Sequence, residues 1–399
     1  MKKLLIIETY YEGHYLTGYI KYILRSLKNK NFEITLLTSK KTIKYGKGAI
    51  QILNEEKVKF KIISEDFDNY PFFLKGNLYF QQVINYNKLI NFYKKNLYDN
   101  YDLICFTSLQ RFLIPLCLFG NPFNNIPIIG IFLGAKFHLK YFKIFQPGSF
   151  DLIYKILFKI LLKKPFIKSV ILNDHLLEKF IKKYYENLSK KILFLHDPKE
   201  TRFKLNKVKV RKSLNLSKKS KYILLYGALI DSKGLEELFQ IIKSNYICKN
   251  IRLIVAGKQF SSTKTFLKSN EVKKLIYEKK IIIFSGWQNE QMEAKLFTAT
   301  DVIWIAYKNY SYPSGVLYQA ASFGLPVILS NDGLINQLNK KYKFGISINI
   351  FNINESAKKI NKIMNIKNYS NFSKNIKIFY NLTKPNNWVN GFLKLIRNI

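Results

Sequence analysis

Short apolar runs alternate with longer amphipathic stretches along most of the chain, a pattern typical of α/β domains. In the first half this pattern predicts strands at residues 3–8, 32–38, 59–64, 102–108, 126–133, 169–173 and 191–195. A helical period at residues 16–30 separates the first two strands. The same rhythm restarts in the second half, with strands predicted at residues 222–227, 251–257, 281–286, 301–307, 326–330 and 344–348. We therefore expect two domains with mostly parallel sheets.

A polar and basic stretch at residues 197–221 separates the two halves. It reads as a linker followed by the first helix of a second domain. The tail from residue 354 is helical, and it ends with Trp388, Phe392 and Leu395 on one helical face that must be buried against something. We expect domains at residues 1–200 and 201–375, followed by a helical segment at residues 376–399.

The composition is that of a folded chain. Of 399 residues, 48% are hydrophobic and 16% aromatic, which excludes a disordered protein. The three cysteines, Cys105, Cys117 and Cys248, stand apart in apolar surroundings, so we expect buried reduced thiols, which suit the cytoplasm. The apolar run at residues 4–7 is too short for a signal peptide, and no run approaches the roughly 20 residues of a membrane span.

The charge is unusual, because 66 lysines and arginines face 26 acids and leave a formal net charge of +40. Such a chain is attracted to anionic surfaces, namely a bilayer leaflet, nucleic acid or a phosphorylated substrate. No zinc-finger, RNP-like or helix-turn-helix signature is present, so we expect no nucleic-acid partner. An anionic membrane surface is the expected partner, and a merely solvated basic surface is the alternative.

One basic and apolar stretch bears on the membrane question. The segment FDLIYKILFKILLKKPFIK places Lys155, Lys159 and Lys163 four residues apart, on one side of a helix. The remaining surface of that helix is broadly apolar, as in helices that lie in a membrane interface. The alternative is a domain helix packed on the sheet with a lysine stripe outward.

The loops that follow strands are the expected sites of chemistry, because ligands of doubly wound sheets bind at the carboxyl ends of strands. After the first strand, Gly13 and His14 precede a helix whose free N–H groups and positive end can receive an anion. In the second half Gly227 ends a strand, and Lys233 and Gly234 open the next helix. A lysine there can reach a phosphate; alternatively, it is a solvated lysine beside a glycine cap.

Two further loops of the second half carry candidate ligand contacts. After the strand that ends at Gly286, Trp287 and Gln288 offer a stacking face and an amide to a nucleobase, or the ring simply covers the sheet edge. After residues 301–307, the Pro-Ser-Gly turn at residues 313–315 combines a fixed backbone angle, a good helix N-cap and room for a close approach. This turn predicts an anion cradle.

A family resemblance rests on the segments YGALIDSKGLEEL, IRLIVAG, IIIFSGWQNEQMEAKLFTATDVIWIAY and SYPSGVLYQAASFGLPVI. In order and spacing they resemble the C-terminal domain of GT-B fold glycosyltransferases, most closely glycosyltransferase family 4 (group 1). In the first half, GHYLTGYIKYILRSLKNKNFEITLLTS is similar to the family's opening glycine loop and first helix. The resemblance implies two Rossmann-like, doubly wound domains that face a cleft, with a C-terminal helix returning to the N-terminal domain.

The resemblance also implies a donor site in the second domain. Lys233 would contact the diphosphate of a nucleotide-sugar donor, and the helix that starts at Ser314, Gly315 and Val316 would point its N-terminus at the same group. No metal or cofactor is expected for this work, because the lysine and the backbone amides carry the charge.

Three positions depart from the family's pattern. Gln319 stands where an acidic residue normally holds the donor ribose, and Ser311 stands where the family has an earlier glutamate. Ala228 replaces the arginine that usually follows the glycine of YGALIDSKG. An amide can still hydrogen-bond ribose hydroxyls, but loss of the arginine removes one cation from the phosphate site.

The acceptor side has weaker candidates. The family often carries a histidine after the fifth strand, and His138 is the matching residue here, proposed as catalytic together with Lys233. Asp174 ends a strand and could meet acceptor hydroxyls. His175 and His196 are assigned structural or surface roles.

The combined reading is a glycosyltransferase, of hexosyltransferase type, that acts on a glycan or lipid-linked acceptor in cell-surface polysaccharide synthesis. If it follows the family it retains anomeric configuration, and we expect it in the cytoplasm, peripheral on the inner face of the membrane. One alternative is a catalytically silent GT-B-like subunit that docks on a membrane or partner. The other is a nucleotide-sugar epimerase of similar fold.

Overall fold

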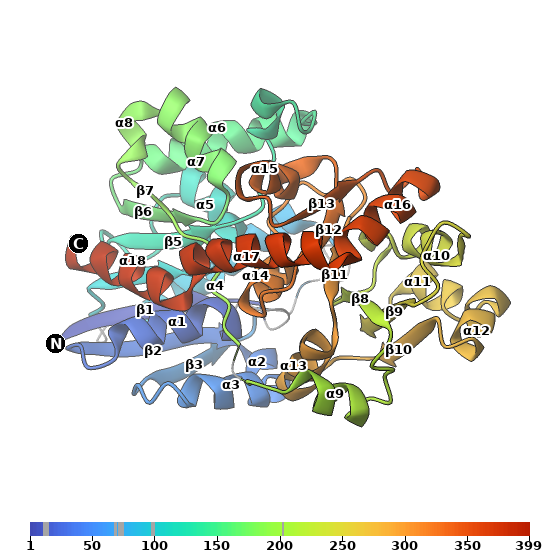
Figure 1. The fold of residues 1–399 in the computed structure, drawn as a ribbon. Helices are drawn as coiled ribbons and strands as arrows, with labels where there is room; N and C mark the ends of the chain where they lie inside the picture. The colour runs from blue at the N-terminus through green and yellow to red at the C-terminus, as the bar shows by residue number, and fades with distance from the viewer. Residues whose placement is uncertain (11–15, 68–69, 71–75, 97–99, 202) are drawn as a thin grey trace. The chain divides into compact units, whose positions relative to one another are not determined.

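The computed structural model describes residues 1–10, 16–67, 70, 76–96, 100–201 and 203–399. The chain divides into two compact units, shown in Figure 1. Unit 1 comprises Met1–Pro198 together with Pro385–Ile399, and unit 2 comprises Lys199–Lys384. The expected segment 376–399 therefore starts too early, because unit 2 continues to the end of helix α17 (Ile366–Thr383) and Pro385 begins the next helix.

Unit 1 contains a parallel sheet with strand order β3-β2-β1-β4-β5-β6-β7. Its strands are β1 (Lys2–Glu8), β2 (Phe32–Ser39), β3 (Lys61–Glu65), β4 (Leu103–Phe106), β5 (Ile128–Phe132), β6 (Ile167–Leu172) and β7 (Ile192–Phe194). These correspond to the seven predicted strands. The order reverses between β1 and β4, and this point of an open parallel sheet is where ligands usually bind.

The helices of unit 1 cover both faces of this sheet. They are η1 (Leu16–Ile20), α1 (Lys21–Leu27), α2 (Lys40–Tyr45), α3 (Lys47–Asn54), α4 (Leu78–Lys95), η4 (Leu109–Phe112), α5 (Leu113–Leu118), η5 (Leu139–Phe142), α6 (Ser149–Lys163), α7 (His175–Tyr184) and α8 (Glu186–Ser189). Alternate strand residues face different layers: Leu5 and Ile7 belong to one apolar core, whereas Leu4 and Ile6 belong to the other. Burial of strands on both faces explains why their apolar runs are nearly continuous.

Unit 2 repeats the architecture with the parallel strand order β10-β9-β8-β11-β12-β13. Its strands are β8 (Lys221–Tyr226), β9 (Ile251–Gly257), β10 (Ile281–Ser285), β11 (Val302–Ile305), β12 (Val327–Ser330) and β13 (Gly345–Ile348). They match the six predicted strands, and the order reverses between β8 and β11. The two-unit α/β fold expected from the sequence is confirmed.

The helices of unit 2 also form two layers on the sheet. They are α9 (Lys207–Ser213), η6 (Asp231–Lys233), α10 (Leu235–Lys243), α11 (Ser261–Phe266), α12 (Asn270–Tyr277), α13 (Glu290–Ala299), α14 (Gly315–Ser322), α15 (Gly333–Tyr342), α16 (Ile353–Met364) and α17. Arg211 attaches α9 to the sheet, because its Nη2 lies 2.7 Å from Oδ2 of Asp301 and its Nε donates to the carbonyl of Ala299.

The last helix, α18 (Pro385–Arg397), returns to unit 1 as expected. Trp388 is buried, with its ring 6.2 Å from that of Tyr19 and 6.4 Å from that of Tyr22 on the η1–α1 segment. Phe392 stacks on Trp388. A Cβ added at Gly391 would lie 2.6 Å from Leu195 Cδ2, so the glycine permits a close approach to the sheet. The predicted apolar face of this helix is thus buried against unit 1.

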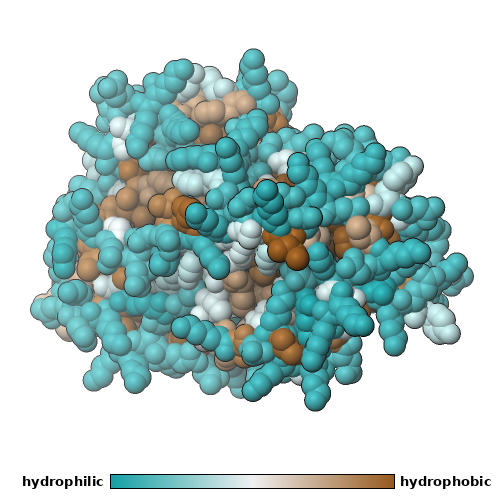
Figure 2. Space-filling view, in the orientation of Figure 1, coloured by the Kyte–Doolittle hydropathy of each residue, from teal (hydrophilic) through white to brown (hydrophobic). Residues whose placement is uncertain are grey.

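The surface reflects the composition. Figure 2 shows a face covered mostly by hydrophilic side chains, with smaller hydrophobic patches between them. None of the helices in the described part of the chain has the length and apolar character needed to cross a bilayer. Cys105 and Cys117 are buried, and burial raises their pKa to about 12 and about 11, respectively. The expectation fails for Cys248, which is exposed ahead of β9.

Candidate functional site

The loop after β8 holds Lys233 at the point where the strand order of unit 2 reverses. Its second glycine, Gly234, has φ +68°, and a Cβ there would lie 2.8 Å from the carbonyl oxygen of Ala306, just beyond β11. The indole Nε1 of Trp304 on β11 donates to the carbonyl of Lys233 at 2.9 Å. Gly227, with φ +104°, turns the chain away from β8. Lys233 is therefore fixed between the carboxyl ends of β8 and β11.

The Lys233 side chain is half buried against an aromatic ring. Its Nζ lies 3.9 Å from the centroid of the Tyr307 ring, at cation–π distance. Burial lowers the pKa of Lys233 to about 8. Among the described residues no acid forms an ion pair with it, whereas the neighbouring Lys308 lies 3.0 Å from Oε1 of Glu237. The arrangement leaves the ammonium group available to an anionic ligand.

Tyr307 presents a second unsatisfied group at the same place. The side chain is buried, and within the described parts of the chain its hydroxyl has no hydrogen-bond partner of normal geometry. Burial raises the pKa of Tyr307, and the nearby Ser314 hydroxyl offsets part of this increase. The tyrosine therefore stays protonated, so that it can donate a hydrogen bond without adding negative charge beside Lys233.

Helix α14 begins beside this pair. Ser314 occupies its N-cap position with extended backbone angles, but its side chain makes no capping hydrogen bond, contrary to the expectation of a good cap. The first amides of a helix have no intrahelical acceptor, and no acidic residue occupies the first turn of α14. Gly315 is exposed, and a Cβ there would meet nothing within 4 Å. The helix start is thus open to a ligand at Gly315 and at the half-buried Val316.

The positions that depart from the family pattern differ in exposure. Gln319, one turn into α14, is half buried, so it remains accessible. Ser311 is buried at 6% exposure. Ala228 is exposed on the loop after β8 and leaves room where a longer cation would project. Of these three residues, Gln319 is the one best placed to meet a ligand beside Gly315.

The loop after β10 lies at the edge of the sheet, two strands away from β8. Gly286 takes φ +86°, and the Trp287 ring is 71% exposed. The amide nitrogen of Gln288 donates to the carbonyls of Phe284 and Gly286 at 3.2 and 3.0 Å. The side chain of Gln288 therefore caps the strand end, while Trp287 offers an open ring face.

The structure brings His138 and Asp174 of unit 1 together in the interior. His138 is fully buried, and its Nε2 lies 2.9 Å from Oδ2 of Asp174, although neither ring nitrogen makes a hydrogen bond of normal geometry with a described residue. Oδ1 of Asp174 caps α7 by accepting from the amides of Leu176 and Leu177. Because His138 has no exposed surface, this arrangement holds the start of α7 and gives an acceptor no direct access to the ring.

A buried acidic group that the sequence reading missed lies where the strand order of unit 1 reverses. Glu8 ends β1 with no exposed surface, and its Oε2 accepts from the hydroxyls of Thr107 and Ser108 at 2.5 and 3.0 Å. Burial raises the pKa of Glu8, and the nearby Arg111 opposes this change. The sequence signal was an acid at a strand end. Gly13 and His14 lie outside the described residues.

A metal centre has no visible ligand set in this structure. No group of three or more histidines, cysteines or acids lies together among the residues described. The charged groups that gather at the ends of β8 and β11 are instead a lysine and backbone amides, which bind anions.

The comparisons with known proteins agree with this geometry. Residues 206–378 match the family model described as glycosyl transferases group 1. This segment lies within unit 2 and includes Lys233 and α14. A search of curated proteins gave no significant match. The predicted resemblance to group 1 glycosyltransferases is confirmed by the family match.

Solved structures match along the whole chain. Anabaena HepE, in a complex with UDP and glucose, superimposes with a TM-score of 0.69 at 13% identity, covering 100% of both chains. Sucrose-phosphate synthase from Thermosynechococcus elongatus gives 0.71 at 14% identity, covering 100% of this chain and 99% of its own. WaaG, a glycosyltransferase involved in lipopolysaccharide biosynthesis, gives 0.65 at 13% identity, covering 97% and 98%. At these identities the likeness establishes the GT-B fold.

Proposed function

We propose that this chain transfers a sugar from a nucleotide diphosphate sugar to a glycan or lipid-linked acceptor in cell-surface polysaccharide synthesis. The observation that carries the proposal is the unpaired ammonium group of Lys233, which packs on Tyr307 beside the open start of α14. A diphosphate fits this combination of a cation and helix amides. HepE was solved with UDP and glucose, and WaaG acts in lipopolysaccharide biosynthesis, which supports both the donor class and the pathway.

The proposed chemistry needs no metal or cofactor. The bond between the anomeric carbon and the donor phosphate oxygen breaks while an acceptor oxygen bonds to the same carbon, with retention of configuration. The acceptor proton passes to the departing diphosphate. Lys233 and the amides of Gly315 and Val316 stabilise the charge that develops on that diphosphate, and Lys233 keeps its proton throughout.

The remaining donor contacts are proposed for residues around this centre. Trp287 would stack on the nucleobase, with Gly286 and Gln288 shaping the loop that presents it. The Gln319 amide would hydrogen-bond ribose hydroxyls. The buried Ser311 would act from behind the Pro-Ser-Gly turn by supporting its backbone.

The proposed location is the cytoplasmic face of a membrane. Helix α6 packs Phe158, Leu161 and Leu162 into the core, as a domain helix does, yet it leaves Ile153 and Ile156 exposed. The two readings of this segment thus combine in one helix. With a net charge of +40, an exposed face of lysines and apolar residues suits the surface of an anionic bilayer.

Calorimetric titration with UDP, GDP and their sugars tests the donor site. Replacing Lys233 by alanine should weaken binding of the matching nucleotide by at least about 1 kcal/mol, the contribution of a charge-assisted hydrogen bond. Lys233→Arg should retain most of the affinity because it keeps the charge. Lys209→Ala, at an exposed site on α9, is the matched control and should bind like the parent. An unchanged affinity in Lys233→Ala would remove this residue from the site.

The same titration separates the rival function, a silent subunit that docks on a membrane or partner. Ala228, Ser311 and Gln319 motivate this rival, because acids and an arginine of the family pattern are missing there. Absence of nucleotide binding at millimolar concentration would favour the silent subunit. Nucleotide binding followed by transfer to a membrane lipid extract, detected by mass spectrometry, would favour the enzyme.

A further inference from the structure

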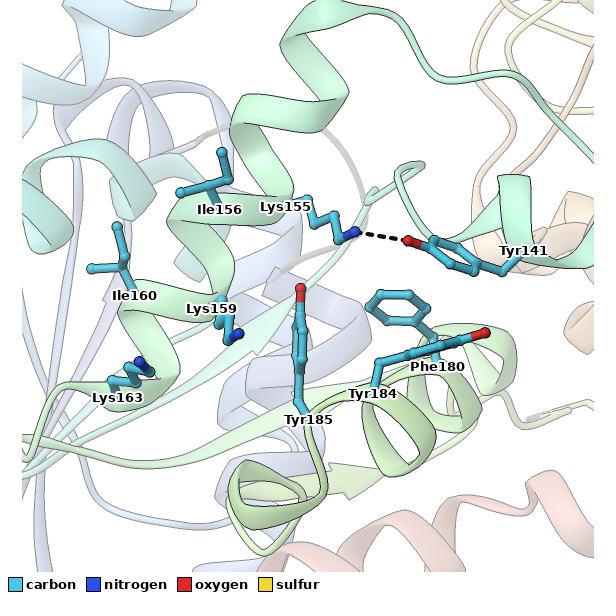
Figure 3. Close-up of a pocket in the computed structure, with 9 residues that line it drawn as sticks. All are labelled: Tyr141, Lys155, Ile156, Lys159, Ile160, Lys163, Phe180, Tyr184 and Tyr185. Carbon is cyan, nitrogen blue, oxygen red and sulfur yellow. Dashed lines mark hydrogen bonds between the residues drawn. The ribbon is translucent and has the colours of Figure 1, made fainter.

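A pocket of about 460 Å³ lies between α6 and α7 on unit 1, outside the donor site. It is lined by Tyr141, Lys155, Ile156, Lys159, Ile160, Lys163, Phe180, Tyr184 and Tyr185, which are shown in Figure 3. We infer that this pocket binds the phosphate group of an anionic membrane lipid. The inference deepens the membrane association proposed above and rests on it.

The charge of the pocket is entirely positive. Lys155, Lys159 and Lys163 line it, and none of the described residues of its lining is acidic. No described acid forms an ion pair with any of these lysines. The acids of the neighbouring helix ends are engaged elsewhere: Asp151 accepts from the amide of Gly148, and Glu178 pairs with Lys182. An anionic group of a ligand would therefore be attracted without competition from a carboxylate in the lining.

Aromatic side chains hold two of the lysines in place. Figure 3 shows Lys155 reaching across from α6 to the hydroxyl of Tyr141, at an Nζ–O distance of 2.8 Å. Nζ of Lys159 lies 5.2 Å from the ring centroid of Tyr185, at cation–π distance. Ammonium groups positioned in this way lose less conformational freedom when they bind a phosphate than free surface lysines do.

The pocket opens beside an apolar surface that suits lipid rather than a free phosphate ion. Ile156 and Ile160 belong to its lining and are exposed, and Leu152 and Ile153 continue the exposed face of α6. At the start of α6, Phe150 stacks on Tyr79 of α4 at 5.6 Å, and both rings are exposed. A phosphate in the pocket would place acyl chains against this face, as in interfacial helices.

Flotation with vesicles tests the inference, using the full chain without nucleotide. The parent protein should bind vesicles of phosphatidylglycerol mixed with phosphatidylcholine, and it should not bind pure phosphatidylcholine. K155Q/K159Q/K163Q should bind about 100-fold more weakly, roughly a factor of five for each lysine near an anionic surface. The matched control K268Q/K273Q/K274Q removes the same charge from exposed positions on unit 2 and should bind like the parent.

Three comparisons keep the result interpretable. K155R/K159R/K163R should retain binding, and Ile156→Glu, a single change at an exposed position, should reduce it even if the triple glutamine variant is unstable. Equal loss in the pocket variant and the unit 2 control would overturn the inference, since net charge alone would then explain binding. Release by inorganic phosphate but not by chloride at equal ionic strength would also overturn it, because the pocket would then hold a free ion. UDP titration without vesicles reports separately on the donor site.

Discussion

At the residue scale, Lys233 is expected to cost the folded protein stability in return for binding. Its folded pKa of about 8 lies below the usual 10.5, because burial disfavours the charged form. Below about pH 8 the lysine is charged in both states, so the cost is fully present; between pH 8 and 10.5 the unfolded chain binds more protons, so stability rises with pH. Lys233→Met should therefore raise the free energy of unfolding at pH 7, by about 1 kcal/mol.

Denaturant unfolding of Lys233→Met and the parent at pH 7 and above pH 10.5 checks this sign. The advantage of the variant should shrink as pH rises, whereas the exposed Lys209→Met should show no such trend. A variant that is less stable at pH 7 would mean that the contact of the ammonium group with Tyr307 outweighs its desolvation.

A neighbouring residue, Gly315, gives the opposite separation of binding from stability. A Cβ at this position meets nothing within 4 Å, and alanine favours a helix more than glycine does. Gly315→Ala should therefore stabilise the free protein by up to about 1 kcal/mol. The added methyl group should nevertheless weaken UDP binding severalfold, because it occupies the space in front of the α14 amides. Unchanged UDP affinity in this variant would show that the ligand does not approach Gly315.

At the element scale, the contribution of α18 can be measured at Trp388. Its indole is buried against η1 and α1, so Trp388→Ala should lower the free energy of unfolding by about 3–5 kcal/mol, as for other buried aromatics. Trp388→Phe should cost much less, because the buried indole Nε1 has no partner among the described groups. Ile366→Ala, at an 83% exposed position, should be nearly neutral in denaturant unfolding. Equal effects of all three would contradict packing of α18 on unit 1.

The elements were predictable because each strand is a short apolar run between helical periods, whereas their ends and contacts were less so. The predicted strand 301–307 ends at Ile305, since the chain turns there and the Tyr307 amide donates to the Ile305 carbonyl. The strand 102–108 ends at Phe106, because Thr107 and Ser108 turn to bind Glu8. Glycine turns and Lys233 were visible as local patterns. Tyr307 under Lys233, and Glu8 beside Thr107, were not, because these pairs are far apart in sequence.

At the scale of the whole molecule, the net charge of +40 means that most cations lack an acidic neighbour and repel one another. Salt screens this repulsion, since the Debye length falls from about 30 Å at 0.01 M to about 8 Å at 0.15 M ionic strength. The thermal unfolding temperature should therefore rise with sodium chloride, by about 2–4 °C for each kcal/mol of repulsion that is relieved. Differential scanning fluorimetry measures this directly. Sodium phosphate at matched ionic strength should stabilise further, because a phosphate that occupies the Lys233 site favours the folded state. A flat or falling response to chloride would mean that cation–π and main-chain contacts, such as those of Lys155 and Lys159, already neutralise the surface.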